Sequence, residues 1–411
     1  FKVYTEMYIP VTHNTHGNGA STGNYPDALM PQENAVKYGL NEVKQGQNGC
    51  AYLEFYIPKD AEAGVYVGSA AVNVDGAKKV VPIEAKIYDY TLSDETTSKS
   101  IFVVTTSSLA AREYDSTQEM YDKYLSLLKK SRLTPHSYCA NLQSRQYCEK
   151  AIEYLDSGSS TIAVRHISSG ESLNIDWLYT DLIEFAKLSL RDNRNYLDMC
   201  VYYNGVIDEP WFRRFPDGLV EKNINLFDDT IARVKQTLLK CSDFNTAFGQ
   251  QLINSVDNVK HLITDYKVDV GNEMLHRNAL LKNADGSLLY YDDKDVSLCP
   301  AFDGILSDKD IEDYRGHATK TENEMWWYGC CVPIYPYPSY HMEDNLPSAM
   351  LISWMMAEYG IVGNLYWSMN CWPTVEDPYK ITNCGYGANG EGILCYPGRV
   401  YGVDGPVSSL R

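Results

Sequence analysis

The chain changes its pattern of apolar and polar residues near residue 95. Before that point, short stretches of alternating apolar residues are separated by turns that contain glycine, proline or aspartate. Asp75-Gly76 lies between two such stretches, which is typical of a tight β-hairpin. Short strands with frequent turns favour two facing sheets. We therefore predict a small all-β sandwich domain over residues 1–95, with strands at 51–58, 65–74 and 79–89.

From about residue 100, predicted strands alternate with segments of helical spacing. The clearest helix covers 118–130, where Met120, Tyr124 and Leu128 lie on one face. The alternation predicts an α/β fold over residues 100–411, a TIM-like (β/α)8 catalytic barrel that includes a loop-rich C-terminal segment. Further helices are predicted at 178–190, 226–239, 307–315 and 347–359, and strands at 101–106, 199–207, 325–332 and 361–369.

The composition narrows the class of ligand. Hydrophobic residues make up 44% of the chain and the formal net charge is −18, so the chain is globular and strongly acidic. We expect no nucleic-acid partner, because phosphate backbones are bound by basic surfaces. The most apolar stretch, 349–357, is too short to span a bilayer, so no membrane span is predicted. The 33 tyrosines and seven tryptophans suit either sugar stacking or core packing.

The cysteines and histidines give no metal signature. The 11 cysteines form no C-x-x-C pair, so we interpret most as reduced core residues, with Cys330 and Cys331 inside a buried strand. His13 and His16 have H-x-x-H spacing, but no third ligand is evident. We therefore predict no metal and no cofactor.

Two adjacent carboxylates are the sharpest chemical signal. The apolar segment before Asp208 and Glu209 reads as a strand, and Pro210 stops it. In a TIM-type barrel the carboxyl ends of the strands form the active-site face. Two carboxylates there repel each other, so at least one should have a raised pKa, and a protonated acid is what a leaving glycosidic oxygen needs. The residues themselves also allow a simple turn that caps the next helix.

Adjacency favours one kind of glycosidase mechanism. Carboxylates that are neighbours in sequence flank a sugar less naturally than carboxylates on different strands. They suit substrate-assisted hydrolysis, in which the substrate's own 2-acetamido oxygen attacks the anomeric carbon. One carboxylate then holds the acetamido N–H, while the other protonates the leaving oxygen and activates water.

Short segments in a fixed order carry a family resemblance. They are Y-P-D-A-L-M-P at 25–31, the strand turn at 58–67, I-D-E-P at 207–210, W-Y-G-C at 327–330, P-I-Y-P-Y-P-S-Y at 333–340, G-N-L-Y-W-S at 363–368, G-E-G-I-L-C-Y-P-G at 390–398 and P-V-S-S-L-R at 406–411. In these segments the chain resembles glycoside hydrolase family 123, the β-N-acetylgalactosaminidase group. Glu391 stands where that family more usually has aspartate.

The resemblance implies an activity and two roles. The chain would be a retaining, substrate-assisted hydrolase of terminal β-linked N-acetylhexosamine, with GalNAc as the first candidate. Asp208 would orient and stabilise the acetamido group, and Glu209 would be the general acid/base. The partner would be a glycan or glycoconjugate.

Six further side chains are predicted substrate contacts: Tyr203, Trp327, Tyr335, Trp367, Trp372 and His136. Tyr335 and Trp372 follow predicted strands and could stack on a sugar face. The family resemblance assigns Trp327 and Trp367 to the subsite of the terminal sugar. Tyr203 could offer a hydroxyl to the acetamido carbonyl, and His136 lies near a predicted strand.

Two other functions stay open at this stage. The chain could be a glycosidase for another sugar without acetamido participation, or a non-catalytic carbohydrate-binding module. The substrate class favours an extracellular or cell-surface location, whereas reduced cysteines are compatible with the cytoplasm. The sequence does not indicate an oligomeric state.

Overall fold

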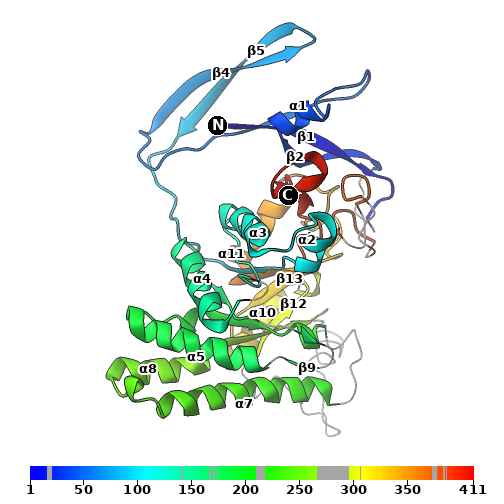
Figure 1. The fold of residues 1–411 in the computed structure, drawn as a ribbon. Coiled ribbons are helices and arrows are strands. Elements are labelled where there is room, and N and C mark those ends of the chain that lie inside the picture. Colours follow the sequence, from blue (N-terminus) through cyan, green and yellow to red (C-terminus); the bar gives the residue numbers. More distant parts are fainter. Residues whose placement is uncertain are drawn as a thin grey trace.

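The computed structural model describes residues 1–15, 21–139, 142–165, 168–169, 172–173, 175–209, 218–265, 296–305, 307–372, 377–382, 385 and 387–411. The whole is a mixed α/β fold that contains parallel sheets (Figure 1). Among the described helices, none is long and apolar enough to cross a bilayer.

The N-terminal part contains a three-stranded antiparallel sheet. β1 (Lys2–Val11) lies between β2 (Gly23–Pro31) and β3 (Ala51–Glu54), and α1 (Gln32–Lys37) follows β2 directly. Alternating residues of β1 bury Ile9 and Val11, which pack with Ala28 and Met30 of β2. This sheet is therefore attached to the main hydrophobic core by one face.

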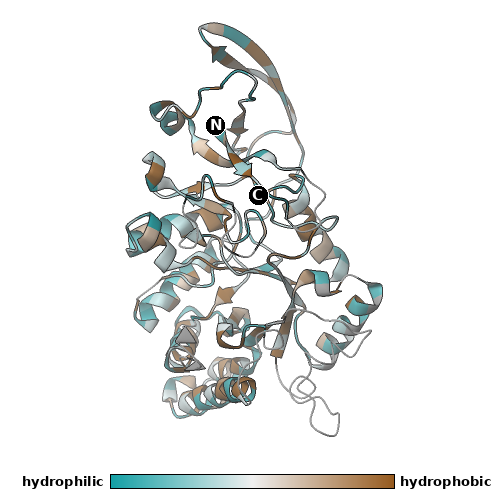
Figure 2. Cartoon of the chain, turned by 90° about the vertical axis from the view of Figure 1, so that its right-hand side faces the viewer, coloured by the Kyte–Doolittle hydropathy of each residue, from teal (hydrophilic) through white to brown (hydrophobic). Residues whose placement is uncertain are grey.

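A long hairpin follows the sheet. β4 (Gly64–Val74) pairs with β5 (Ala77–Ile87), and the connecting Asp75 and Gly76 both have positive φ, at 50° and 82°. This backbone matches the predicted tight turn. The hairpin projects from the rest of the chain in Figure 1, and Figure 2 shows hydrophobic stretches along it.

The predicted β-sandwich is not closed. Nearly all side chains of β4 and β5 are exposed, and an open cleft of about 2010 Å³ separates the hairpin from β1 and β3. A sandwich requires the inner faces of two sheets to interdigitate. Among the described residues the two sheets do not do so.

Two parallel sheets form the centre of the molecule. One has the order β13-β14-β6 and the other β12-β11-β10-β7. A parallel bridge between Ala301 and Tyr328 connects them, and a second bridge joins Phe102 to Pro135. Their bounds are β6 (Lys99–Phe102), β7 (Ile162–Ala163), β10 (Cys200–Tyr203), β11 (Lys260–Asp265), β12 (Val296–Pro300), β13 (Trp326–Gly329) and β14 (Gly363–Tyr366).

The predicted closed (β/α)8 barrel is not shown. In the described part of the chain no ladder joins the segment at Pro135 to β7. Instead, the Tyr138 hydroxyl accepts a hydrogen bond from Ala163 N at 3.3 Å and donates to Thr161 O at 3.4 Å. A side chain thus occupies the position where backbone pairing would close the sheet.

Helices cover the outer faces of these sheets. The predicted helix at 118–130 is confirmed as α3 (Gln118–Lys130), whose Thr117 caps the Met120 amide. The others are α2 (Thr106–Arg112), α4 (Ser144–Asp156), α5 (Ile175–Asp192), α7 (Leu219–Leu239), α8 (Ala247–Ser255), α10 (Asp308–Lys320) and α11 (Ser348–Tyr359). The short pairs β8 (Ser168–Ser169) with β9 (Ser172–Leu173) and β15 (Cys395–Pro397) with β16 (Pro406–Ser408) complete the fold.

A buried ion pair fastens the N-terminal sheet to the C-terminal segment. Arg411 donates from Nε and Nη2 to Asp27, at 2.9 and 2.8 Å, and Tyr396 donates its hydroxyl to the same carboxylate. Arg411 also donates to the carbonyls of Tyr340 and Ile393. The exposed fractions of Arg411 and Asp27 are 8% and 1%, so water cannot replace these contacts.

We predict that Asp27→Asn lowers the free energy of unfolding by about 3–5 kcal/mol, because it leaves the buried Arg411 guanidinium without its counter-charge. Asp156→Asn is the matched control, since Asp156 pairs with Arg194 at the surface. That substitution should lower the free energy of unfolding by less than about 1 kcal/mol. Urea unfolding of both variants measures the difference, and equal losses would contradict a structural role for the buried pair.

Candidate active site

Neighbouring strands bring hydroxyl groups to one edge of the parallel sheets. Tyr203 ends β10, Thr264 is the penultimate residue of β11, Tyr328 is the penultimate residue of β13, and Tyr366 ends β14. The carboxyl ends of parallel strands meet at the same edge, which is where ligands bind in such folds. Each of these four hydroxyls contacts a carboxylate.

Asp208 is held by two of them. Thr264 Oγ1 donates to Asp208 Oδ1 at 2.5 Å, and Tyr203 OH donates to the same oxygen at 3.4 Å. The short helix η2 (Gly205–Ile207) precedes Asp208, and Asn204 caps it by accepting from Val206 N. The chain therefore turns immediately after β10 and places Asp208 over the end of β11.

Glu209 adopts a strained backbone. Its φ of 47° lies in the left-handed region, which costs a non-glycine residue on the order of 1–3 kcal/mol. The neighbours that hold this geometry are Thr264, whose Oγ1 accepts from Glu209 N at 3.4 Å, and Tyr328, whose hydroxyl donates to Glu209 Oε1. Strain of this kind concentrates at functional sites, where surrounding contacts fix the conformation.

The tyrosines beside the two carboxylates remain neutral donors. Burial raises the pKa of Tyr203 and of Tyr328 well above the ordinary tyrosine value, and nearby Asp208 and Glu209 raise these pKa values further. Both hydroxyls thus keep their protons at neutral pH. A neutral O–H can donate to a carboxylate without adding charge to the site.

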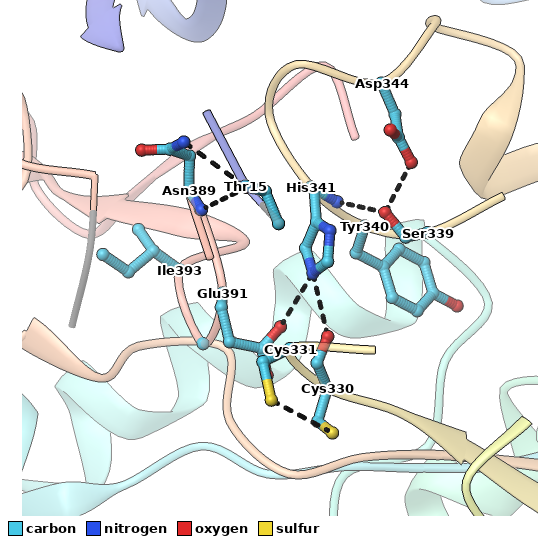
Figure 3. Close-up of polar contacts among 12 residues, drawn as sticks. Thr15, Cys330, Cys331, Ser339, Tyr340, His341, Asp344, Asn389, Glu391 and Ile393 are labelled. Atoms are coloured by element: carbon cyan, nitrogen blue, oxygen red, sulfur yellow. Dashed lines mark hydrogen bonds and ion pairs between the residues drawn. The ribbon is translucent and has the colours of Figure 1, made fainter. Parts of the chain in front are cut away.

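A third carboxylate, Glu391, lies close by in the C-terminal segment. Trp367 Nε1 donates to Oε1, and Tyr366 OH donates to Oε2 at 3.3 Å. Burial raises the pKa of Glu391 to about 8, although the bonds from Trp367 and Tyr366 oppose this shift. Glu391 is therefore mostly protonated at neutral pH. His341 Nε2 is 3.8 Å from Glu391 Oε2 (Figure 3).

The structure brings several predicted site residues together. Tyr203 contacts Asp208 directly, and Asp208 is followed by Glu209 at the sheet edge. Trp367 joins this region through Glu391. His136 directly follows Pro135, which pairs with Phe102 at the end of β6. Its Nδ1 accepts a hydrogen bond from Val104 N at 3.3 Å.

Three predicted contacts lie elsewhere. Trp327 is 1% exposed and stacks on Phe302, with ring centroids 4.8 Å apart, in the cluster beneath α10 and α11. Trp372 is fully buried, and its Nε1 donates to Cys395 O at 3.0 Å. Tyr335 is 54% exposed in the loop after β13. The structure does not bring these aromatic rings to Asp208.

Sequence reasoning gave no site role to Thr264, Tyr328 or Glu391. Tyr328 lies in the strand predicted at 325–332, so its position offered a signal, whereas no strand was predicted around Thr264. Glu391 carried a signal as an acidic residue between two glycines, but a glycine-flanked acid is also typical of an ordinary turn. Its burial could not be read from the local sequence. Among the described residues, no group of three or more metal-ligating side chains could hold a metal ion.

Two comparisons with known proteins gave a match, one of sequence and one of fold. Residues 272–411 match the sequence signature of the glycoside hydrolase 123 catalytic domain. This matched segment, 140 of the 411 residues, is similar to glycoside hydrolase family 123. A solved structure with a similar fold belongs to a family 123 glycoside hydrolase from Clostridium perfringens, described for glycolipid glycan hydrolysis; the TM-score is 0.55 at 13% identity, covering 100% of this chain and 73% of that one. Curated protein sequences gave no match.

The family 123 match supports glycosidase activity. It covers the segment that carries Tyr328, Trp367 and Glu391, but it begins after Asp208 and Glu209. The roles of these two carboxylates therefore depend on the geometry at the sheet edge.

We predict that Glu391 makes stability depend on pH. Its pKa of about 8 in the folded chain exceeds the ordinary value, so the fold favours the protonated form and this stabilisation is lost as pH rises through about 8. Between about pH 5 and pH 9, wild type should lose roughly 3–4 kcal/mol more than Glu391→Gln. Urea unfolding at both pH values measures this. Parallel losses in the two proteins would contradict a protonated Glu391.

Proposed function

We propose that this chain is a retaining glycoside hydrolase that removes terminal β-linked N-acetylhexosamine, with GalNAc as the first candidate sugar, by substrate-assisted catalysis. The observation that carries this proposal is the adjacent pair Asp208 and Glu209, held at the carboxyl edge of the two parallel sheets by hydroxyls from β10, β11 and β13. Such a pair matches the two roles that acetamido participation requires.

In the first step, the acetamido oxygen of the substrate forms a bond to the anomeric carbon, and the glycosidic bond breaks. Asp208 accepts the acetamido N–H and stabilises the positive charge that develops on the resulting oxazolinium. The bonds from Thr264 and Tyr203 fix this carboxylate in place beforehand, which avoids reorganisation during the reaction.

Glu209 supplies the proton in that first step. It protonates the leaving oxygen as a general acid, and in the second step it takes a proton from the water that opens the oxazolinium ring. The Tyr328 hydroxyl supports the ionised form of Glu209 between these steps. Two inversions at the anomeric carbon give net retention.

Three predicted residues support substrate binding in this proposal. Tyr203 adjoins Asp208, while Trp367 and His136 lie near the same sheet edge. Because the related protein from Clostridium perfringens is described for glycolipid glycan hydrolysis, glycolipid glycans are suitable natural substrates to test.

We expect wild type to cleave aryl β-glycosides that carry a 2-acetamido group and to leave plain hexosides intact. Asp208→Asn and Glu209→Gln should each lose about 10²–10⁴-fold in kcat, because each loses the ionisable group that its step needs. Asp156→Asn is the matched control and should keep full activity, because Asp156 forms an ion pair with Arg194 at the surface. Initial rates on both substrate types give the comparison.

The other functions are outcomes of this assay. Equal cleavage of plain hexosides would reject acetamido participation and indicate a glycosidase for another sugar. If wild type binds glycans but neither wild type nor any variant cleaves them, the chain would be a carbohydrate-binding module. A thiazoline that mimics the oxazolinium should bind wild type, and Asp208→Asn should weaken its binding more than Glu209→Gln.

Tyr328→Phe should lower kcat about 10–100-fold with little change in KM, because it removes one donor to a group that changes charge during the reaction. Without that donor the ionised carboxylate is less stable relative to the acid. Because Glu209 must be protonated to act as the general acid, the basic limb of the kcat/KM–pH profile should move to higher pH. Tyr314→Phe is a matched control, since Tyr314 bonds only to backbone groups between β12 and β13 among the described residues. An unchanged profile for Tyr328→Phe would contradict this role.

A further inference from the structure

Cys330 and Cys331 form a pair of facing thiols just after β13. The sequence predicted that these residues would lie inside a buried strand, but β13 ends at Gly329 and both cysteines are half-buried beyond it. Their Sγ atoms are 3.9 Å apart (Figure 3).

The backbone holds this pair in place. Cys330 N donates to Val332 O at 2.9 Å, which makes a tight turn through Cys331. The carbonyl of Cys330 accepts from His341 Nε2, also at 2.9 Å. The two sulfurs therefore meet because the chain turns here, and a buried imidazole fixes the orientation of the peptide between the two residues.

The two thiols are electrostatically unequal. The hydrogen bond from Cys330 lowers the pKa of Cys331 to about 7, despite partial burial, whereas the same contact and burial raise the pKa of Cys330 well above its usual value. Cys331 is thus the more readily ionised thiol and the stronger nucleophile near neutral pH, with Cys330 as its hydrogen-bond partner. The buried cysteines Cys200 and Cys395 have raised pKa values instead, because of burial first and nearby carboxylates second.

The pair lies within electrostatic reach of carboxylates of the candidate site. The negative charges of Glu209 and Asp303 act on Cys331, and Cys331 in turn acts on Glu391. Tyr328, which donates to Glu209, lies only two residues before Cys330. A covalent change at these sulfurs would therefore alter both the charge and the backbone next to Glu209.

We propose that Cys330 and Cys331 form a redox-reactive dithiol that peroxide-class oxidants convert to a vicinal disulfide beside the candidate active site. The Cys331 thiolate attacks one peroxide oxygen, the O–O bond breaks, and Cys331 becomes a sulfenic acid while hydroxide leaves and takes a proton. Cys330 then attacks the sulfenic sulfur, forms the S–S bond and releases water. Two thiols lose two electrons and two protons, and one peroxide becomes two waters.

Ring closure must bring the sulfurs from 3.9 Å to about 2 Å, so the peptide at Cys330 has to rotate. That rotation loosens the contact with His341 and displaces the strand end that carries Tyr328. The oxidised protein should therefore have lower hydrolase activity, and dithiothreitol should restore it. Only this activity measurement rests on the proposed function. The thiol chemistry can be tested independently of any hydrolase activity.

The test treats reduced wild type, Cys330→Ser and Cys331→Ser with hydrogen peroxide in the presence of dimedone, followed by chymotryptic digestion and mass spectrometry. The wild-type peptide that contains residues 329–335 should lose two hydrogens and carry little dimedone. Cys330→Ser should accumulate the dimedone adduct of sulfenic acid at Cys331, and Cys331→Ser should stay unmodified at Cys330. Cys50→Ser is the control for the exposed thiol and should behave as wild type at this peptide.

Alkylation by iodoacetamide gives a second, non-oxidative measurement. Cys331 should react with a midpoint near pH 7, and Cys330→Ala should slow its labelling at pH 7 about 10-fold, since alanine has no donor to stabilise the thiolate. Peroxide that leaves the wild-type peptide unchanged would overturn the proposal. Equal dimedone capture in wild type and Cys330→Ser would also overturn it, because Cys330 would then not resolve the sulfenic acid.

Discussion

Carboxylates that are partly or fully buried at the edge of a parallel sheet need hydrogen-bond donors, and the donors must come from neighbouring strands. Here the hydroxyls of Thr264 and Tyr203 serve Asp208, that of Tyr328 serves Glu209, and that of Tyr366 serves Glu391. The parallel arrangement makes this possible, because it brings all the strand ends to one edge. The pairing of the strands therefore also determines the geometry of the candidate site.

The same requirement explains why distant segments are tied together. Glu391 belongs to a segment with little regular structure, so its position has to be fixed by other contacts. Arg411 supplies them by donating to the carbonyls of Gly390 and Ile393, while its charge is balanced by Asp27 of β2. The N-terminal sheet is thus tied to the C-terminal segment by a buried guanidinium as well as by its packing on the main core.

Local patterns predicted the parts of the fold that local forces determine. The helix at 118–130 and the turn at Asp75-Gly76 are confirmed, since apolar periodicity and positive φ are properties of short segments. The closed barrel and the packed sandwich depend on pairing between distant segments, which periodicity does not report. In the same way, the acidic pair was visible in sequence, but its donors Thr264 and Tyr328 lie about 55 and 120 residues away and meet it only in the folded chain.

The candidate site contains several groups that can carry a negative charge. If Asp208, Glu209, Glu391 and Cys331 were all ionised, four negative charges would share a poorly hydrated region, and each would destabilise the others. Burial avoids this at Glu391 by raising its pKa to about 8, which keeps the carboxyl largely neutral near pH 7. A negative charge on the Cys331 thiolate then acts on both Glu209 and Glu391, and oxidation to the neutral disulfide removes it. The state of the thiol pair and the protonation of the carboxylates are therefore linked, in either direction.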